Sequence, residues 1–164
     1  MDPQVLSEVH EQYFSQLYRY VRYRVPDHNV AEDLTSETFV QLLDAVHSRK
    51  GPNSSIRGWL FGTAANLINS YFRRKYREEK LFEEGKLKLG QSSQPNHIKR
   101  IEQKDLLSAA IEKLTGDQQH VIALRFGTGM SIQETARVMD KKENAVKALQ
   151  FRAIRSLRQE LEED

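Results

Sequence analysis

Residues 131–152 read SIQETARVMDKKENAVKALQFR and carry the clearest structural signal in the chain. Ser131 and Glu134 form the pattern of a capping box, in which each side chain accepts a hydrogen bond from the other residue's backbone N–H at the start of a helix. Asp140 and Lys141 interrupt the apolar pattern and predict a turn, after which a longer basic helix follows. A short capped helix, a tight turn and a longer helix are typical of a helix-turn-helix, whose second helix enters the major groove of DNA.

The longer helix has two chemically distinct faces. Apolar residues at helical spacing are expected to face inward, namely Val146, Leu149, Ala153 and Leu157. The opposite face and its flanks carry Asn144, Lys147, Ala148, Phe151, Arg152 and Arg155. Lys and Arg bind phosphates or guanine edges, Asn pairs with adenine, and Ala or Phe contacts the methyl group of thymine. These residue types favour DNA binding over the alternative, a solvated basic helix that ends a bundle.

The rest of the chain is also predicted to be helical, because no useful alternating pattern of a strand appears. Three apolar stripes, Tyr13–Val21, Phe39–Val46 and Leu60–Tyr71, predict three helices that share one core. Nearer the helix-turn-helix, Thr115 and Gln118 form a second capping-box pattern.

Residues 85–97 are rich in Gly, Ser, Gln and Asn, a composition typical of a flexible linker. The sequence therefore predicts an all-α fold of two small helical domains joined by this linker. The expected boundaries are 1–83 for the first domain, 84–99 for the linker and 100–164 for the second domain.

The composition excludes several classes of protein. The 164 residues contain no cysteine, which excludes disulfides, thiolate chemistry and cysteine-bound zinc. No apolar run reaches the roughly 18 residues of a membrane-spanning helix, and no export signal is visible, so we expect a cytoplasmic chain without membrane insertion. The five histidines are scattered without ligand spacing, and neither a nucleophile elbow nor a dinucleotide-binding fingerprint is present. We therefore expect no catalytic residue, no metal and no cofactor.

Charge is segregated along the chain, although 25 basic and 23 acidic residues give a net charge of only +2. Residues 27–46 carry five acids and no Lys or Arg, and residues 73–77 carry four bases and no acid. Residues 141–158 carry six bases and one acid. One acidic block and two separated basic runs predict one protein contact and two nucleic-acid contacts. The helix that leads into the first basic run mixes amides, a hydroxyl group and aromatics, which suits unpaired bases.

Three segments of this sequence resemble bacterial sigma factors, and specifically the extracytoplasmic-function (group IV) sigma factors. They are residues 31–39 (AEDLTSETF), residues 56–66 (IRGWLFGTAAN), and residues 131–136 (SIQETA) followed by 144–147 (NAVK). Each motif alone is moderately specific, and the three in this order and spacing are strongly specific. The resemblance implies that the first domain is sigma region 2, that the second is sigma region 4, and that the chain directs core RNA polymerase to promoters.

The resemblance also implies the partners of each part. The acidic block is expected to bind the clamp coiled coil of the polymerase β′ subunit through Asp33, Glu37, Gln41 and Asp44. Region 4 is expected to bind the β flap as well as promoter DNA. A further expected partner is an anti-sigma factor that covers the polymerase-binding surfaces.

Region 2 of this family recognises the minus-ten promoter element as a single strand. The resemblance assigns minus-ten contacts to Trp59, Asn66, Asn69, Ser70, Arg73 and Arg74. The loop 47–55 resembles one that holds a flipped-out base, and flipping costs roughly a few kcal/mol of unstacking. Trp59 matches one of two adjacent tryptophans that open duplex DNA in housekeeping sigma factors, and Leu60 stands at the second position. We therefore expect DNA opening to depend mainly on the base pocket.

Region 4 is expected to read the minus-thirty-five element as duplex DNA. The contact positions of the family fall on Arg125, Lys142, Asn144, Lys147, Ala148, Phe151 and Arg152, with Arg125 on the preceding helix as a phosphate contact. Asp140 stands where many members have glycine, and Asp tolerates the left-handed backbone of such a turn. Ala148 and Leu149 replace a common Ser-Arg pair, which implies a different minus-thirty-five preference.

The main alternative is a stand-alone helix-turn-helix repressor or activator, which would bind duplex operator DNA tightly without polymerase. The acidic block and the helix 59–74 favour the sigma factor over this alternative. A third hypothesis is an enzyme that acts on nucleic acid, and the scattered histidines disfavour it.

Overall fold

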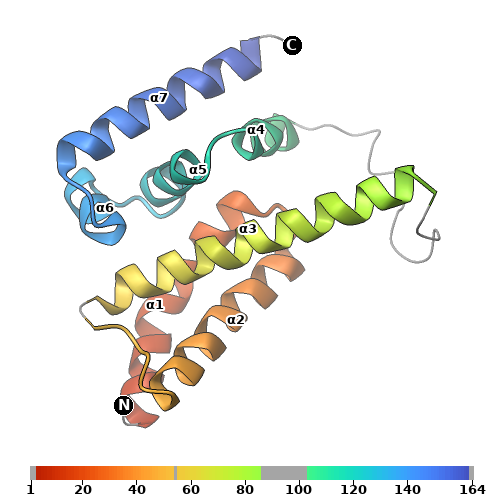
Figure 1. Ribbon diagram of the computed structural model, residues 1–164. Helices are drawn as coiled ribbons and strands as arrows, with labels where there is room; N and C mark the ends of the chain where they lie inside the picture. Colours follow the sequence, from red (N-terminus) through yellow and green to blue (C-terminus); the bar gives the residue numbers. More distant parts are fainter. Residues whose placement is uncertain (1–2, 54, 86–102, 163–164) are drawn as a thin grey trace.

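The structure is a computed structural model that describes residues 3–53, 55–85 and 103–162 (Figure 1). Within these ranges the elements in chain order are α1 (Pro3–Arg24), α2 (His28–His47), α3 (Ile56–Glu83), α4 (Gln103–Glu112), α5 (Gly116–Ile122), a turn of π-helix η2 (Ala123–Gly127), α6 (Ile132–Met139) and α7 (Glu143–Glu162). The described residues contain no strand, so the all-α prediction is confirmed. The expected linker, residues 84–99, lies outside the described residues except for its first two positions.

Side-chain caps fix where several helices begin. Both predicted capping boxes are formed, at Thr115 and at Ser131. In the second box, the Oγ atom of Ser131 accepts a hydrogen bond from the backbone N–H of Glu134 at 3.0 Å. Asp27 caps α2 by accepting from the backbone N–H of Asn29 at 2.9 Å. One acid of the acidic block, Asp27, therefore accepts hydrogen bonds from backbone N–H groups that have no partner within the helix.

The N-terminal half of the chain is a bundle of α1, α2 and α3 (Figure 1). The prediction that these helices share one core is confirmed, because each contributes a fully buried side chain, such as Leu17, Leu42 and Phe61. The ring of Phe61 meets the ring of Tyr20 edge-on, with 5.4 Å between the ring centroids. Burial of this face of α3 leaves its polar residues on the other side of the helix.

The C-terminal half, which comprises α4, α5, η2, α6 and α7, contains the predicted helix-turn-helix, formed by α6 and α7. Its core includes the buried side chains of Val121, Ala136, Val146 and Ala153. Asp140 follows α6 with φ 53° and ψ 49°, which is the left-handed region that the sequence analysis expects for this turn. This residue ends α6 and redirects the chain into α7.

The two halves pack directly against each other, with contacts between α3 and α6 and between α1 and η2 (Figure 1). Ala123, Leu124 and Met130 of the C-terminal half are buried in the core of the N-terminal bundle. Residues 126–130 (FGTGM) have the glycine-rich composition of a turn, whereas the side chain of Met130 is 1% exposed. This segment is therefore part of the contact between the two halves.

Gly127 brings η2 close to α1. A Cβ atom at this position would lie 2.9 Å from the Cβ atom of Tyr23 and 3.1 Å from its Cγ atom. Real Cβ atoms essentially never approach as closely as 2.9 Å, so a side chain at position 127 requires a shift of η2 or of α1 near Tyr23.

Substitution of Ser131 by alanine is expected to lower the free energy of unfolding by about 1 kcal/mol, because the Glu134 N–H loses its acceptor. The matched control is Ser131→Thr, which keeps a hydroxyl acceptor and is expected to cost only about a few tenths of a kcal/mol. Urea titration followed by circular dichroism measures both values. Equal stability of the Ser131→Ala variant and the wild type would contradict the assigned cap.

Candidate nucleic-acid interface

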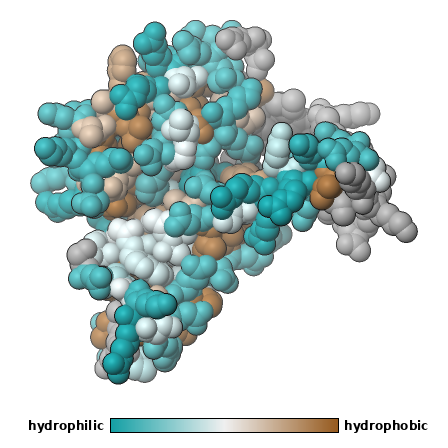
Figure 2. Space-filling view, viewed as in Figure 1, coloured by the Kyte–Doolittle hydropathy of each residue, from teal (hydrophilic) through white to brown (hydrophobic). Residues whose placement is uncertain are grey.

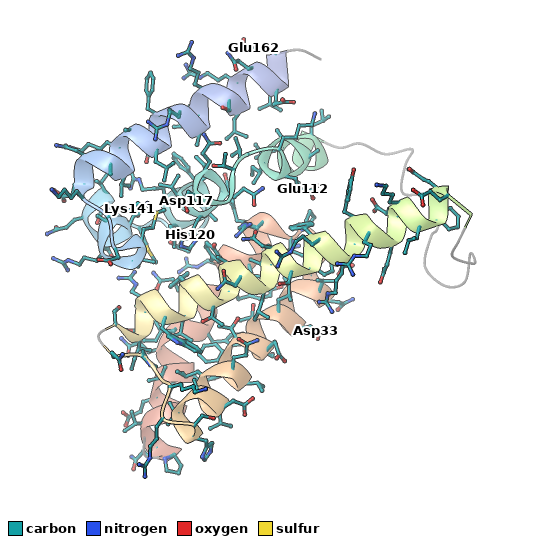
Figure 3. All side chains as sticks on the ribbon, in the orientation of Figure 1. Asp33, Glu112, Asp117, His120, Lys141 and Glu162 are labelled. Atoms are coloured by element: carbon teal, nitrogen blue, oxygen red, sulfur yellow. The ribbon has the colours of Figure 1, made fainter. Side chains whose placement is uncertain are left out.

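The outer face of α7 is open to solvent and lies on the far side of the C-terminal half from α1, α2 and α3 (Figures 1 and 3). The predicted minus-thirty-five residues on this face and in the preceding turn are all exposed, namely Lys142, Asn144, Lys147, Ala148, Phe151 and Arg152. The Phe151 side chain is 67% exposed although it is apolar. A protruding helix face with cations, an amide and an aromatic ring has the chemistry to enter a major groove.

Arg125 does not share this exposed face. Its Nε atom donates to Oε1 of Gln150 at 2.7 Å, and its Nη1 atom donates to the backbone carbonyl of Met130. These bonds brace the segment between η2 and α7. The expected contact of Arg125 with phosphate stays a prediction, and in this structure its guanidinium has a structural role.

Five of the six predicted minus-ten residues lie along the middle of α3, between positions 66 and 74. Asn66, Arg73 and Arg74 are exposed, and Asn69 and Ser70 are half-buried. The Arg73 Nη2 atom donates to Ser70 Oγ at 3.0 Å, so these two side chains are already oriented together.

A groove runs between residues 69–80 of α3, the end of α4 and the start of α5. Its lining includes several cations and two aromatic rings, together with two carboxylates: Arg73, Lys75, Arg77, Lys80, Phe72, Tyr76, Glu79 and Glu112. Tyr76 is 71% exposed. Cations that follow a phosphate backbone, together with aromatic rings on which bases stack, are typical of single-strand binding.

Trp59 is half-buried and packs against the core of the N-terminal bundle. It lies in the first turn of α3, directly after the loop 47–55, which the structure describes except for residue 54. The role of Trp59 in opening duplex DNA stays a prediction.

The outer face of α2 is acidic and partly apolar. The predicted polymerase-binding residues fall on one face because their spacing follows the helical repeat, and they are Asp33, Glu37, Gln41 and Asp44. Asp33, Glu37 and Asp44 are exposed, and Gln41 is half-buried. Val40 and Leu43 beside them are 48% and 40% exposed. Exposed apolar side chains among carboxylates suit a protein partner with a basic surface.

A buried polar network joins the two halves. Arg24 at the end of α1 is 3% exposed. Its Nη2 atom donates to Oδ1 of Asn69 at 2.7 Å and to Oε1 of Gln119, and its Nη1 atom donates to the hydroxyl oxygen of Tyr20 at 3.2 Å. The Tyr20 hydroxyl lies 2.5 Å from Nδ1 of His120. Because Tyr20 accepts from Arg24, its own proton is free to be donated to His120.

Neither Arg24 nor His120 was predicted from the sequence as a functional residue. The signal for Arg24 is its position, because it lies four residues after Tyr20 and seven after Leu17, on the apolar stripe of α1. A charged residue on such a stripe is buried only with partners. Local spacing contains no signal for His120, because its partner Tyr20 is 100 residues away in sequence.

His120 is neutral in this closed arrangement. Burial and the neighbouring Arg24 cation lower the pKa of His120 from 6.5 to about 4, and Asp117 acts in the opposite direction. A neutral ring accepts the Tyr20 proton at Nδ1, whereas a protonated ring has no acceptor there. Since the pKa is lowered by folding, the stability that His120 contributes is present above pH 6.5 and is lost as the pH falls towards 4.

This fold and these surface faces are those of a helical DNA-binding protein with a helix-turn-helix. The family model "Sigma-70 region 2" matches residues 9–78, and the model "Sigma-70, region 4" matches residues 110–159. The chain is 34% identical to the ECF RNA polymerase sigma factor BldN of Streptomyces coelicolor, over 96% of this chain and 61% of that protein, so it spans about three fifths of that relative's length. It is 31% identical to the ECF RNA polymerase sigma factor SigX of Bacillus subtilis, over 94% of this chain and 82% of that protein.

A solved structure has the same fold. The sigma factor RpoE in complex with the anti-sigma factor NepR, from Bartonella quintana, matches with a TM-score of 0.61 and 22% identity over 96% of this chain and 97% of that chain. The sequence matches show the family, and the chain belongs to the extracytoplasmic-function sigma factors of RNA polymerase. The family expected from the motifs is therefore confirmed. Among the described residues, no helix is long and apolar enough to cross a membrane.

The free energy of unfolding is expected to fall by up to about 3 kcal/mol more in the wild type than in a His120→Gln variant between pH 6.5 and pH 4. Glutamine keeps an acceptor for the Tyr20 hydroxyl and does not titrate, so the comparison isolates the histidine from the carboxylates that titrate in both chains. Urea titrations at a series of pH values measure the difference. Parallel pH profiles for the two chains would contradict the assigned protonation state.

Proposed function

We propose that this chain is a promoter-specificity subunit, which binds core RNA polymerase and directs it to specific promoters. The observation that carries the proposal is the separation of three chemically different faces on one chain: the acidic and apolar face of α2, the basic and aromatic face of α3, and the basic outer face of α7. A stand-alone repressor requires only the last of them.

We further propose that the family's two regions correspond to residues 1–83 and 100–164, joined by residues 84–99. The outer face of α7 reads the minus-thirty-five element in the major groove, with Asn144, Lys147 and Arg152 at base edges or phosphates. The exposed polar end of α3 reads the melted minus-ten strand, where flipped bases stack on aromatic rings and cations hold the backbone. Binding energy from the captured strand then offsets the cost of opening the duplex.

The proposed contacts with polymerase rest on charge complementarity. The carboxylates of α2 bind the β′ clamp coiled coil, and the second region also binds the β flap. The relative of known structure from Bartonella quintana is bound to an anti-sigma factor, and we propose that such a factor also regulates this chain. The chain itself performs no chemistry, needs no metal or cofactor, and works in the cytoplasm where polymerase and promoter DNA are found.

Substitution of Lys147 or Arg152 by alanine is expected to weaken promoter use by about 1–3 kcal/mol, or roughly 5-fold to 150-fold, if each side chain reads a base edge. The measurement is run-off transcription with core polymerase on promoters recovered from genomic fragments. Promoters with an altered minus-thirty-five element are compared with the originals.

The control for this experiment is Arg19→Ala, which removes an exposed cation from α1. It is expected to leave the minus-thirty-five dependence unchanged. If the Lys147 and Arg152 variants distinguish altered from original promoters as well as the wild type does, the assignment of α7 is wrong.

The double variant Asp33→Lys/Glu37→Lys is expected to lose co-elution with core polymerase, because it reverses the charge of the α2 face. Both side chains are exposed, so the helical signal and the melting temperature are expected to stay near those of the wild type. The matched control, Glu8→Lys/Glu11→Lys, reverses two exposed carboxylates on α1. Full affinity of the Asp33/Glu37 variant for core polymerase would rule out the proposed role of α2.

A further inference from the structure

The side chain of Asn69 on α3 is bonded to the interior of the N-terminal bundle. Its Oδ1 atom accepts a hydrogen bond from Nη2 of Arg24 at 2.7 Å. Arg24 lies at the end of α1 and is 3% exposed, and its Nη1 atom donates to the hydroxyl of the buried Tyr20 at 3.2 Å. These two bonds lie within α1 and between α1 and α3, so they depend on the packing of the N-terminal bundle and not on the position of the C-terminal half.

The guanidinium of Arg24 determines which end of the Asn69 amide faces outward. An amide group accepts hydrogen bonds at its oxygen and donates them from its nitrogen, whereas a guanidinium only donates. The oxygen of Asn69 therefore faces Arg24, and the amide nitrogen points the other way. An amide turned by half a rotation would place N–H groups against a buried cation and would leave a donor of Arg24 without its acceptor, which costs free energy.

The amide nitrogen of Asn69 is available to a ligand. Asn69 is half-buried and lines the groove beside α3, together with the rings of Phe72 and Tyr76. The described residues provide no hydrogen-bond partner for its Nδ2 atom, and the buried side-chain atoms without a partner among them are Nε of Arg24 and Nε of Arg57. The Nδ2 atom is therefore accessible, and its two N–H groups are the polar groups that Asn69 offers to a ligand.

The surroundings of Asn69 suit an unpaired base. Phe72 and Tyr76 supply rings on which a base can stack, and Arg73 supplies a cation for the phosphate backbone. On the face drawn in Figure 2, hydrophobic residues form small patches among hydrophilic ones rather than one continuous surface. A mixed surface of this kind favours a polar ligand with aromatic faces, such as single-stranded DNA, over an apolar protein partner.

We propose that Asn69 is a specificity-determining residue for the melted minus-ten strand and that Arg24 is its positioning residue, which keeps the amide nitrogen turned towards the strand. This inference rests on the proposed function of α3. Guanine and thymine carry a carbonyl acceptor where adenine and cytosine carry an amino group. Since the outward group of Asn69 only donates, it favours guanine or thymine over adenine or cytosine at one position of the element.

The substitution Asn69→Asp reverses the outward chemistry without removing the bond to Arg24. The carboxylate keeps one oxygen as an acceptor for the guanidinium and replaces the outward N–H donors by a second acceptor. This variant is expected to favour adenine or cytosine at the position where the wild type favours guanine or thymine. Each preference is expected to be about threefold to tenfold in affinity, as one hydrogen bond provides.

Base preference is measured on the full chain bound to core RNA polymerase. Fluorescein-labelled single strands span the minus-ten element of a recovered promoter, and each position carries each of the four bases in turn. Fluorescence anisotropy gives the affinity of every strand. The added negative charge of Asn69→Asp weakens all strands alike, so the ratio between strands isolates the base preference. The control Gln12→Glu adds the same charge at an exposed site on α1 and is expected to change neither affinity nor preference.

A matched pair of substitutions tests Arg24 as the positioning residue. Arg24→Lys leaves a group that only donates, so Asn69 is expected to keep its orientation and the base preference of the wild type. Arg24→Gln introduces a group that donates and accepts, so it can pair with either end of the Asn69 amide. The base preference of this variant is expected to fall below about twofold. A merely structural role of Arg24 predicts lower stability in both variants and the same base preference in both.

Thermal unfolding of the free chain, followed by circular dichroism, tests the bond itself. Asn69→Asp keeps an acceptor for Arg24 and is expected to melt no lower than the wild type. Asn69→Leu removes the acceptor and is expected to melt roughly a few degrees lower. Equal melting temperatures of Asn69→Leu and the wild type would show that Arg24 does not hold Asn69.

The outcomes separate this inference from the proposed function. Identical base preferences of the wild type and Asn69→Asp would overturn Asn69 as a specificity-determining residue, and identical preferences of Arg24→Lys and Arg24→Gln would overturn the role of Arg24. A wild-type complex that binds strands without base preference at any position keeps the proposed function and overturns the inference. A wild-type complex that binds no single strand overturns both.

Discussion

One buried guanidinium lies where the two halves of this chain meet. A charged group that leaves water costs several kcal/mol unless its donors are satisfied, so Arg24 must find acceptors around the end of α1. Tyr20 supplies one from the same helix, Asn69 supplies one from α3, and Gln119 supplies one from α5. The bond to Gln119 joins α5 to α1, beside the apolar side chains Ala123, Leu124 and Met130 that are buried against the same bundle.

The local structure was predictable because its signals are local. Capping boxes at Thr115 and Ser131, the left-handed residue Asp140 and the apolar stripes of the long helices are read from residues no more than a few positions apart. The contact between the halves was not predictable, because it joins residues about a hundred positions apart. It also involves two groups, Arg24 and His120, that belong to no motif. The same limit applies to Met130, which has the sequence context of a turn and the burial of a core residue.

The residues of the candidate site also fall into two groups, those whose exposure local spacing predicts and those whose partners it does not. Exposure of the predicted residues on α2 and α7 follows from helical periodicity, so spacing alone indicated these faces. Asn69 and Arg125 differ, because their polar groups are engaged by partners from other elements. The face of α3 that is predicted to bind DNA therefore includes a residue whose amide oxygen is already bonded to α1.

The function proposed for this chain is to give RNA polymerase its promoter specificity. The most direct measurement is co-elution of the purified wild-type chain with bacterial core RNA polymerase, followed by run-off transcription on genomic fragments. The account predicts a stable complex and new transcripts that start at specific sites sharing a minus-ten and a minus-thirty-five element. A chain that does not bind core polymerase but binds duplex DNA tightly on its own would contradict the account and identify a stand-alone regulator.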